Sequence, residues 1–208
     1  MTPAGESRAA ARAVGPDSGI AGILLAAGSG RRYGGAKLLA RLDDVDAVGP
    51  AACRHLLAAV PWVIAVVRPD DRPLAAALAA VGAQVVPCSE ADDGMGASLA
   101  CGVRAAAAAR GWVVALADMP WIAPATIARV AAAVAGGALV AAPFFGGTRG
   151  HPVGFGEGCR AELAALAGDA GAREVVAAHA DRLLRLDVDD PGILRDVDTP
   201  ADLREAEK

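Results

Sequence analysis

The stretch IAGILLAAGSGRRYGGAK, residues 20–37, decides the fold of this chain. Its first seven residues, 20–26, are all apolar or glycine, which is typical of a strand that is buried on both faces of a parallel sheet. Glycines and cations follow where the strand ends, and ligands of open α/β sheets bind at that edge. The stretch therefore predicts a central strand that runs directly into an anion-binding loop.

The rest of the chain alternates short apolar runs with longer Ala-rich segments. We expect strands at Ile20–Ala26, Trp62–Arg68, Ala83–Pro87, Trp112–Ala117 and Ala138–Ala142, and helices at Pro50–Ala59, Leu74–Val81, Ala97–Arg110 and Pro124–Ala135. Such βαβ alternation with right-handed crossovers predicts a Rossmann-like three-layer α/β/α sandwich around a mostly parallel sheet. Shorter elements are expected after Pro143: strands at His151–Phe155 and Leu183–Val188, and helices near Gly158–Leu166, Ala170–Ala178 and Pro200–Glu207.

Composition narrows the classes of partner. The net charge is −4 and only 3% of the residues are aromatic, so there is no electrostatic footprint for a nucleic acid polymer. A long uncharged run, 130–147, is broken by glycines and Pro143, so no membrane span is expected. Residues 1–19 lack an apolar run of signal-peptide length and are interpreted as a flexible tail, with residues 20–208 as one domain. A cytoplasmic protein is the expectation.

The glycine-rich loop has the composition of a triphosphate site. Glycines let backbone N–H groups point at an anion, and Arg31, Arg32 and Lys37 add full positive charges. Two common phosphate motifs are excluded, because Tyr33 replaces a required glycine of the dinucleotide fingerprint and Ala36 stands before Lys37 where a P-loop needs glycine. The alternative is a surface turn with solvated arginines.

A series of motifs gives the chain a family resemblance. Residues 25–37 resemble the pattern L-A-A-G-x-x-x-R-x-G-x-x-K of nucleotidyltransferases with a glycosyltransferase-A-like fold. Further matches follow in order: DGMGASL (93–99), LADMP (116–120), GHPV (150–153), GDAGAR (168–173) and DVDTPADL (196–203). Together they most resemble the molybdenum cofactor cytidylyltransferases. Residues 43–50 depart from the family pattern, which leaves the acceptor side of the pocket less defined than the nucleotide side.

The resemblance implies an activity and its ligands. It implies transfer of CMP from CTP to the phosphate of the molybdenum–pterin cofactor, with release of pyrophosphate, Mg²⁺ (or Mn²⁺) as cofactor and a molybdoenzyme receiving the product. Ala27, where a guanylyltransferase would carry a second glycine, favours the cytidylyl branch. Guanylyl transfer to the same cofactor, transfer to another phosphorylated acceptor, and a non-catalytic cofactor chaperone are the alternatives.

The chemistry assigns a role to each candidate residue. Nucleotidyl transfer needs positioning and charge stabilisation, and an ionised phosphate acceptor needs no general base. Lys37 is expected at the α-phosphate, Arg32 at the β- or γ-phosphate, and Asp118 at the metal as the third catalytic residue. The remaining nucleotide contacts are expected from Ala26, Ala27, Gly28, Ser29, Gly30, Arg31 and Ser98.

The C-terminal half supplies the other candidates. Asp196, and after it Asp198, is expected as a second metal ligand, while His151 and Arg173 are expected at the acceptor. Each has a structural alternative. Asp118 and Asp198 could cap the turns that follow them, Ser98 could simply lie on a helix face, His151 could be a satisfied structural histidine, and Arg173 could pair with Asp169.

Overall fold

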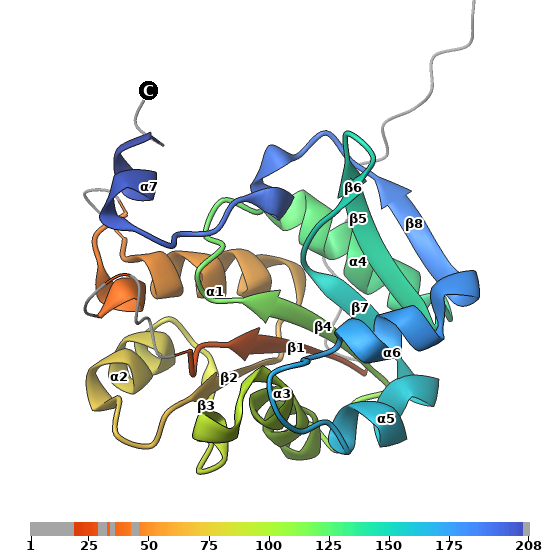
Figure 1. Ribbon diagram of the computed structural model, residues 1–208, viewed down its shortest axis with the longest axis horizontal. Coiled ribbons are helices and arrows are strands. Elements are labelled where there is room, and N and C mark those ends of the chain that lie inside the picture. The colour runs from red at the N-terminus through yellow and green to blue at the C-terminus, as the bar shows by residue number, and fades with distance from the viewer. Residues whose placement is uncertain (1–18, 29–32, 34–35, 43–45, 206–208) are drawn as a thin grey trace, which may run out of the picture.

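The computed structural model describes residues 19–28, 33, 36–42 and 46–205. In this part of the chain one eight-stranded sheet forms the centre, in the order β3-β2-β1-β4-β7-β5-β6, with β8 pairing with β5 (Figure 1). The strands are β1 (Ile20–Leu25), β2 (Val63–Val67), β3 (Gln84–Pro87), β4 (Gly111–Leu116), β5 (Val140–Phe145), β6 (Thr148–Arg149), β7 (Val153–Gly156) and β8 (Leu183–Asp187). Residues 1–18, where most of the expected tail falls, and residues 206–208 lie outside the described residues.

Helices cover both faces of the sheet. The principal ones are α1 (Val48–Ala59), α2 (Arg72–Ala80), α3 (Met95–Ala105), α4 (Pro124–Ala135), α5 (Arg160–Ala164), α6 (Arg173–Ala178) and α7 (Pro200–Glu205). One buried cluster joins α1, α2 and α4 to one face, for example through Leu56, Leu78 and Ile127. A second cluster joins α3, α5 and α6 to the other face, for example through Leu99 and Leu163. The predicted three-layer fold class is therefore confirmed.

The central strands are buried as their composition predicts. All five residues of β2 are buried, as are the first five of β1 and of β4. The packing of α3 onto them is close, because a Cβ on Gly102 would lie 2.7 Å from Ile23 Cγ2 and 2.9 Å from Val66 Cγ2. Glycine at 102 is what allows the helix axis to approach the sheet this closely.

One helix boundary differs from the expectation, and one strand has a direction that was not predicted. Helix α3 spans Met95–Ala105 rather than Ala97–Arg110. It begins directly after Gly94, whose φ of 120° no other residue adopts readily, and Arg160 donates to the carbonyls of Ala107 and Ala109 beyond its end. Strand β7 is antiparallel to both β4 and β5, a direction that its short apolar sequence does not encode.

The register of the sheet gathers three loops at one edge. Leu25 of β1 pairs with Val66 of β2 and with Leu116 of β4, all in parallel. The residues that follow these strands therefore emerge side by side at the carboxyl ends of the strands, where α/β proteins bind ligands. Within the described residues, no helix combines the length and the apolar character that a bilayer crossing requires.

Candidate active site

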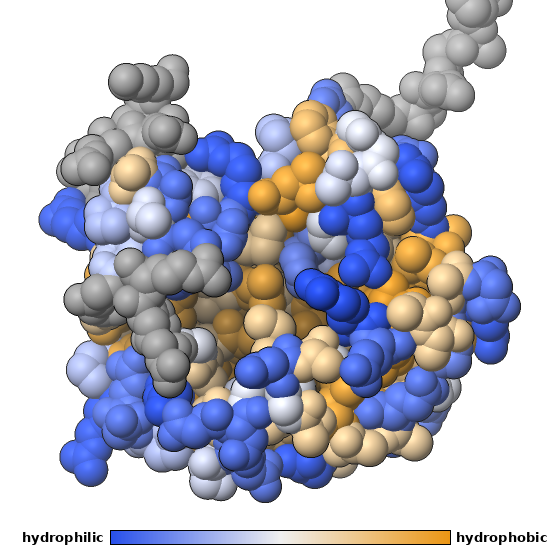
Figure 2. All heavy atoms as spheres, in the orientation of Figure 1, coloured by the Kyte–Doolittle hydropathy of each residue, from blue (hydrophilic) through white to orange (hydrophobic). Residues whose placement is uncertain are grey.

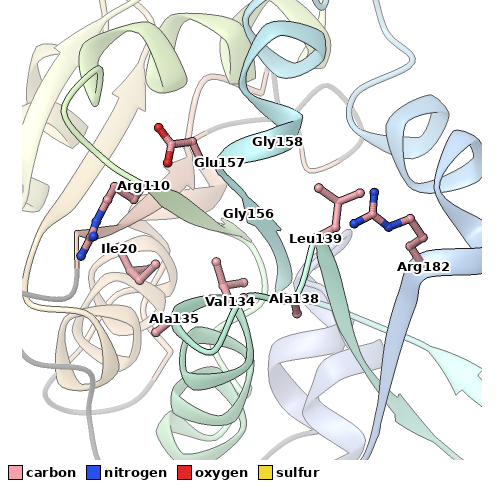
Figure 3. Close-up of a pocket in the computed structure, with 11 residues that line it drawn as sticks. Ile20, Arg110, Val134, Ala135, Ala138, Leu139, Gly156, Glu157, Gly158 and Arg182 are labelled. Carbon is pink, nitrogen blue, oxygen red and sulfur yellow. The ribbon is translucent and has the colours of Figure 1, made fainter.

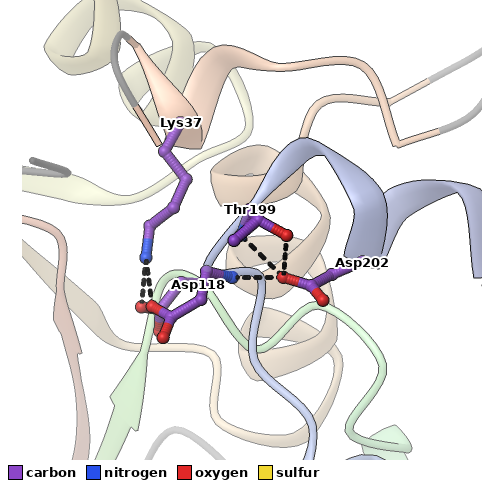
Figure 4. A network of polar contacts seen from close by, with 5 residues as sticks. Lys37, Asp118, Thr199 and Asp202 are labelled. Carbon is purple, nitrogen blue, oxygen red and sulfur yellow. Dashed lines mark hydrogen bonds and ion pairs between the residues drawn. The ribbon is translucent and has the colours of Figure 1, made fainter. Parts of the chain in front are cut away.

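An ion pair between Lys37 and Asp118 lies at this edge of the sheet (Figure 4). Asp118 follows β4, and Lys37 begins a short 3-10 helix, Lys37–Leu39, after the glycine-rich loop. Lys37 Nζ donates to Asp118 Oδ2 at 2.8 Å, with side chains 13% and 26% exposed. The two residues are 81 positions apart in sequence, and the fold places them in direct contact.

The C-terminal segment is fastened against the same strand end. Val197 N donates to the carbonyl of Asp118 at 2.8 Å, and Val197 is fully buried. Further upstream, the buried Asp190 carboxylate accepts hydrogen bonds from Ala123 N at 3.0 Å and Thr126 Oγ1 at 2.6 Å, near the start of α4. These contacts bring Asp198 to within 3.9 Å of Lys37 Nζ, and they leave Asp196 close enough for the charges of Asp198 and Asp118 to act on it.

Asp202, rather than Asp198, caps the last helix. Its Oδ2 accepts from Asp198 N at 2.9 Å, Thr199 N at 2.6 Å and Thr199 Oγ1 at 3.1 Å, so an acid in the first turn reaches back over the helix start (Figure 4). The Asp198 carboxylate points elsewhere, with Oδ1 3.9 Å from Lys37 Nζ. The capping alternative for Asp198 is therefore wrong.

Negative charge is concentrated around the ammonium group of Lys37. Burial, and then the charges of Asp198 and Asp118, raise the pKa of the Asp196 carboxyl. The described residues contain no ready-made cluster of three metal-ligating side chains. A hard cation such as Mg²⁺ does not need one, because one or two carboxylates plus substrate phosphate oxygens satisfy it. The oxygen donors of Asp118, Asp196 and Asp198 fit that chemistry.

A pocket of about 520 Å³ opens beside Asp118. It spans the carboxyl ends of β2, β1 and β4 and the start of α3, and its walls are formed by Leu25, Ala27, Gly28, Arg68, Ala91, Asp92, Gly94, Met95, Ser98, Leu116, Asp118 and Asp169. Figure 2 shows a hollow on this face of the molecule with a hydrophobic floor and hydrophilic side chains around its rim. The arrangement suits an elongated ligand with a charged end.

Several predicted nucleotide contacts reach this pocket. Ala27 and Gly28 line it directly, and Ala26 is buried beside them. Ser98 also lines it, while its hydroxyl donates to the carbonyl of Gly94 at 3.3 Å within α3. Ser29, Gly30, Arg31 and Arg32 lie outside the described residues, so their roles stay predictions.

The acceptor candidates lie in different settings. His151 N donates to the carbonyl of Ile193 at 3.0 Å, which ties it to the C-terminal segment, and its Nδ1 is buried without a hydrogen-bond partner in the described structure. Burial, followed by the positive charge of Arg149, lowers the pKa of His151. Arg173 is exposed at the start of α6 and forms no ion pair with Asp169 in the described part of the chain.

The pocket residues to which the sequence assigned no role include Arg68, Asp92, Met95 and Asp169. Arg68 directly follows β2, so its strand-end position was a usable signal. Met95 and Asp169 gave a weaker sequence signal, because they belong to family-like segments but had no assigned role. Asp92 lies just before such a segment. The GDAGAR segment thus contributes Asp169 to the pocket wall.

A second pocket, of about 380 Å³, lies at the other end of the strands, near the start of β1. It is lined by the start of β1 at Ile20 and the end of α4, and Arg110 and Arg182 lie on opposite sides of it (Figure 3). Ligands of α/β sheets bind at the carboxyl ends of the parallel strands and seldom at their amino ends. The pocket beside Asp118 is therefore the candidate active site.

The family profile described as the MobA-like NTP transferase domain matches residues 22–183. The chain belongs to the MobA-like NTP transferase family. Its core and the candidate site, up to α6 and including Lys37, Asp118 and the pocket, lie within the matched range. The segment with Asp196 and Asp198 lies beyond it.

Individual proteins resemble the chain to different degrees. The phosphoenolpyruvate guanylyltransferase of Thermomonospora curvata is 42% identical over 163 residues, covering 72% of this chain and 64% of that protein. The chain thus spans less than two thirds of that relative's length. A nucleotidyl transferase from Methanothermobacter thermautotrophicus shares the fold with a TM-score of 0.77 and 25% identity, over 90% of this chain and 95% of that one.

A third relative was solved with a metal. Rv0371c of Mycobacterium tuberculosis H37Rv, in a complex with manganese, matches with a TM-score of 0.68 and 28% identity, over 89% of this chain and 96% of that one. Together the similar structures agree with the α/β architecture described above.

Proposed function

We propose that this protein is a Mg²⁺-dependent nucleotidyltransferase that moves a nucleoside monophosphate from a nucleoside triphosphate to a phosphorylated acceptor. The observation that carries the proposal is the Lys37–Asp118 pair, 2.8 Å apart at one end of a pocket that Ala27 and Gly28 also line. Membership of an NTP transferase family supports it. The proposal treats residues 20–208 as one catalytic domain.

The side chains present define how the reaction would be assisted. An oxygen of the acceptor phosphate attacks the α-phosphorus in line, the bond from the α-phosphorus to the bridging oxygen breaks, and pyrophosphate leaves. Lys37 would place its ammonium group against the α-phosphate, where negative charge must be stabilised in the transition state. Arg32 would contact the leaving phosphates. The acceptor is already ionised, so no residue is assigned as a base.

The carboxylates would hold the metal ion. Asp118 would be the principal ligand, with Asp196 or Asp198 as the second, and a bound Mg²⁺ would neutralise phosphate charge and orient the triphosphate. Lys37 now occupies one oxygen of Asp118, so nucleotide binding would redirect its ammonium group from the carboxylate to phosphate. Mn²⁺ is a reasonable substitute, and the manganese complex of a relative supports divalent metal use.

Two versions of the substrates have specific support. The motif set, with Ala27 in the first loop, favours CTP and the molybdenum–pterin cofactor, whose product would pass to a molybdoenzyme, with His151 and Arg173 on the acceptor side. The relative from Thermomonospora curvata, named a phosphoenolpyruvate guanylyltransferase, supports GTP and a small phosphorylated acid instead. Both versions need the same Lys37–Asp118 arrangement.

Pyrophosphate release separates these versions. The purified protein would be incubated with Mg²⁺ and each of the four nucleoside triphosphates, without acceptor, with the molybdenum–pterin cofactor and with phosphoenolpyruvate. We expect acceptor-dependent release with one nucleotide, which identifies both substrates. Release that is independent of every acceptor, or no release with any pair, would contradict the proposal in its present form.

A non-catalytic carrier of the molybdenum–pterin cofactor is the remaining alternative from another functional class. Such a protein would bind the cofactor without needing the carboxylate that faces the triphosphate. We expect Asp118→Asn to abolish transfer while the protein stays folded, because Asp118 is only partly buried. Full function of Asp118→Asn in cells would favour the carrier.

A further inference from the structure

An ion pair forms the wall of the pocket at the end away from Lys37. Arg68 is the first residue after β2, and its guanidinium donates to Oδ1 of Asp92, which lies in the short 3-10 helix Ala91–Asp93. The Arg68 side chain is 26% exposed and that of Asp92 is 78% exposed. Both line the same pocket as Asp118. Neither residue has a role in the phosphate chemistry described above.

The sheet sets the spacing between the two ends of the pocket. Strands β2 and β4 flank β1, so Arg68 and Asp118 follow strands that are two positions apart, or about 10 Å. Ala27 and Gly28 lie between them. A nucleotide whose phosphates met Lys37 and Asp118 would therefore extend its base toward Arg68 and Asp92. The distance between the two ends of the pocket is comparable to the length of a nucleoside.

We propose that the Arg68–Asp92 pair reads the amino-bearing edge of the base and so selects nucleotides with an exocyclic amino group over those without one. This rests on the proposed nucleotidyltransferase function. Arg68 holds Oδ1 of Asp92, and no hydrogen bond to Oδ2 occurs within the described residues. That oxygen accepts from the exocyclic amino group of the base, while a second N–H of Arg68 donates to the neighbouring ring acceptor.

The chemistry of the bases makes the inference selective. Cytosine, adenine and guanine each carry an exocyclic amino group beside a ring nitrogen that accepts a hydrogen bond. Uracil and hypoxanthine lack that amino group and leave the carboxylate of Asp92 facing an oxygen or a bare C–H. A site that is built for a donor rejects the analogue without it, because the polar group of the protein is then left unpaired.

A neighbouring ion pair provides the matched control. Arg104 donates to Glu90 at 2.8 Å, with side chains 49% and 54% exposed, two residues along the chain from Asp92. It is the same type of pair and is not among the residues that form the pocket wall. An effect that comes only from losing a surface ion pair would appear equally when Glu90 is replaced.

The test compares nucleotides that differ in the amino group. kcat/KM would be measured for CTP against UTP and for GTP against inosine triphosphate, in the wild type, Asp92→Ala, Arg68→Ala and the control Glu90→Ala. For the nucleotide pair that the enzyme uses, we expect Asp92→Ala to reduce the preference for the amino-bearing member about 10- to 100-fold. Glu90→Ala should keep the wild-type preference.

Equilibrium binding of the same nucleotides with Mg²⁺ gives a second readout that does not depend on turnover. The base-reading inference would be overturned if an active Asp92→Ala protein kept the wild-type preference for the amino-bearing nucleotide. It would also be overturned if the wild type did not distinguish the two members of either pair. Neither result would count against the proposed function. A wild type that discriminates in binding but releases no pyrophosphate with any acceptor would overturn the proposed function and leave base reading intact. Binding of no nucleotide at all would overturn both.

Discussion

Replacing Lys37 with alanine should slow nucleotidyl transfer far more than it weakens nucleotide binding. The Lys37 side chain is 13% exposed and its ammonium group lies 2.8 Å from a carboxylate, so it is held where a phosphate oxygen can take that place. At an effective dielectric constant of about 20, a unit charge about 4 Å from another contributes about 4 kcal/mol. Loss of one such stabilising group commonly lowers kcat about 10²- to 10³-fold. We expect a decrease in that range.

The assay must separate turnover from binding and from stability. Pyrophosphate release gives kcat, and calorimetric titration with a non-hydrolysable triphosphate gives Kd, which we expect to rise less than about tenfold because ground-state contacts remain. The lost pair contributes only about 1 kcal/mol to folding, equivalent to roughly 2–4 °C in Tm. Arg104→Ala is the control for removing an exposed cation. An unchanged kcat together with a much weaker Kd would refute the assigned role of Lys37.

Three further predictions concern the framework. Gly102→Val should lower the free energy of unfolding by about 2–3 kcal/mol in urea denaturation, because its side chain would press on Ile23 and Val66; wild-type stability would contradict this packing. Asp190→Ala should lower Tm by roughly 6–12 °C, because three donors, two of them in buried hydrogen bonds, lose their acceptor; a change below the error of calorimetry would show that water replaces it. Burial is the main cause that raises the pKa of the Cys101 thiol to about 11. The Cys101 thiol, monitored by peptide mapping, should therefore react about tenfold faster with a disulfide reagent for each unit of pH between 8 and 10, and a rate that is flat above pH 8 would exclude the raised pKa.

The fold could be predicted largely because burial and periodicity agree. The uninterrupted runs of apolar residues and glycine at 20–26 and 62–67 are typical of a parallel core, and the structure has β1 and β2 there. The direction of β7 could not be predicted, since a short apolar run fits a parallel and an antiparallel pairing equally well. Its place between β4 and β5 is set by tertiary pairing.

One part of the candidate site could likewise be predicted from the sequence, and another part could not. Lys37 and Asp118 follow the first and fourth strands of the chain, so strand-end logic predicts their approach, and the structure has them in contact. The Arg68–Asp92 pair depends on two loops that meet only after folding. Asp202 took the cap that sequence spacing also allowed for Asp198, because an acid three positions into a helix can reach back to its start.

Diffraction from crystals grown with Mn²⁺ and a non-hydrolysable nucleoside triphosphate would test the central claim directly. We predict an anomalous peak for manganese within coordination distance of the Asp118 carboxylate, with the triphosphate against Lys37. A manganese ion and triphosphate that are both bound away from Asp118 would contradict the account.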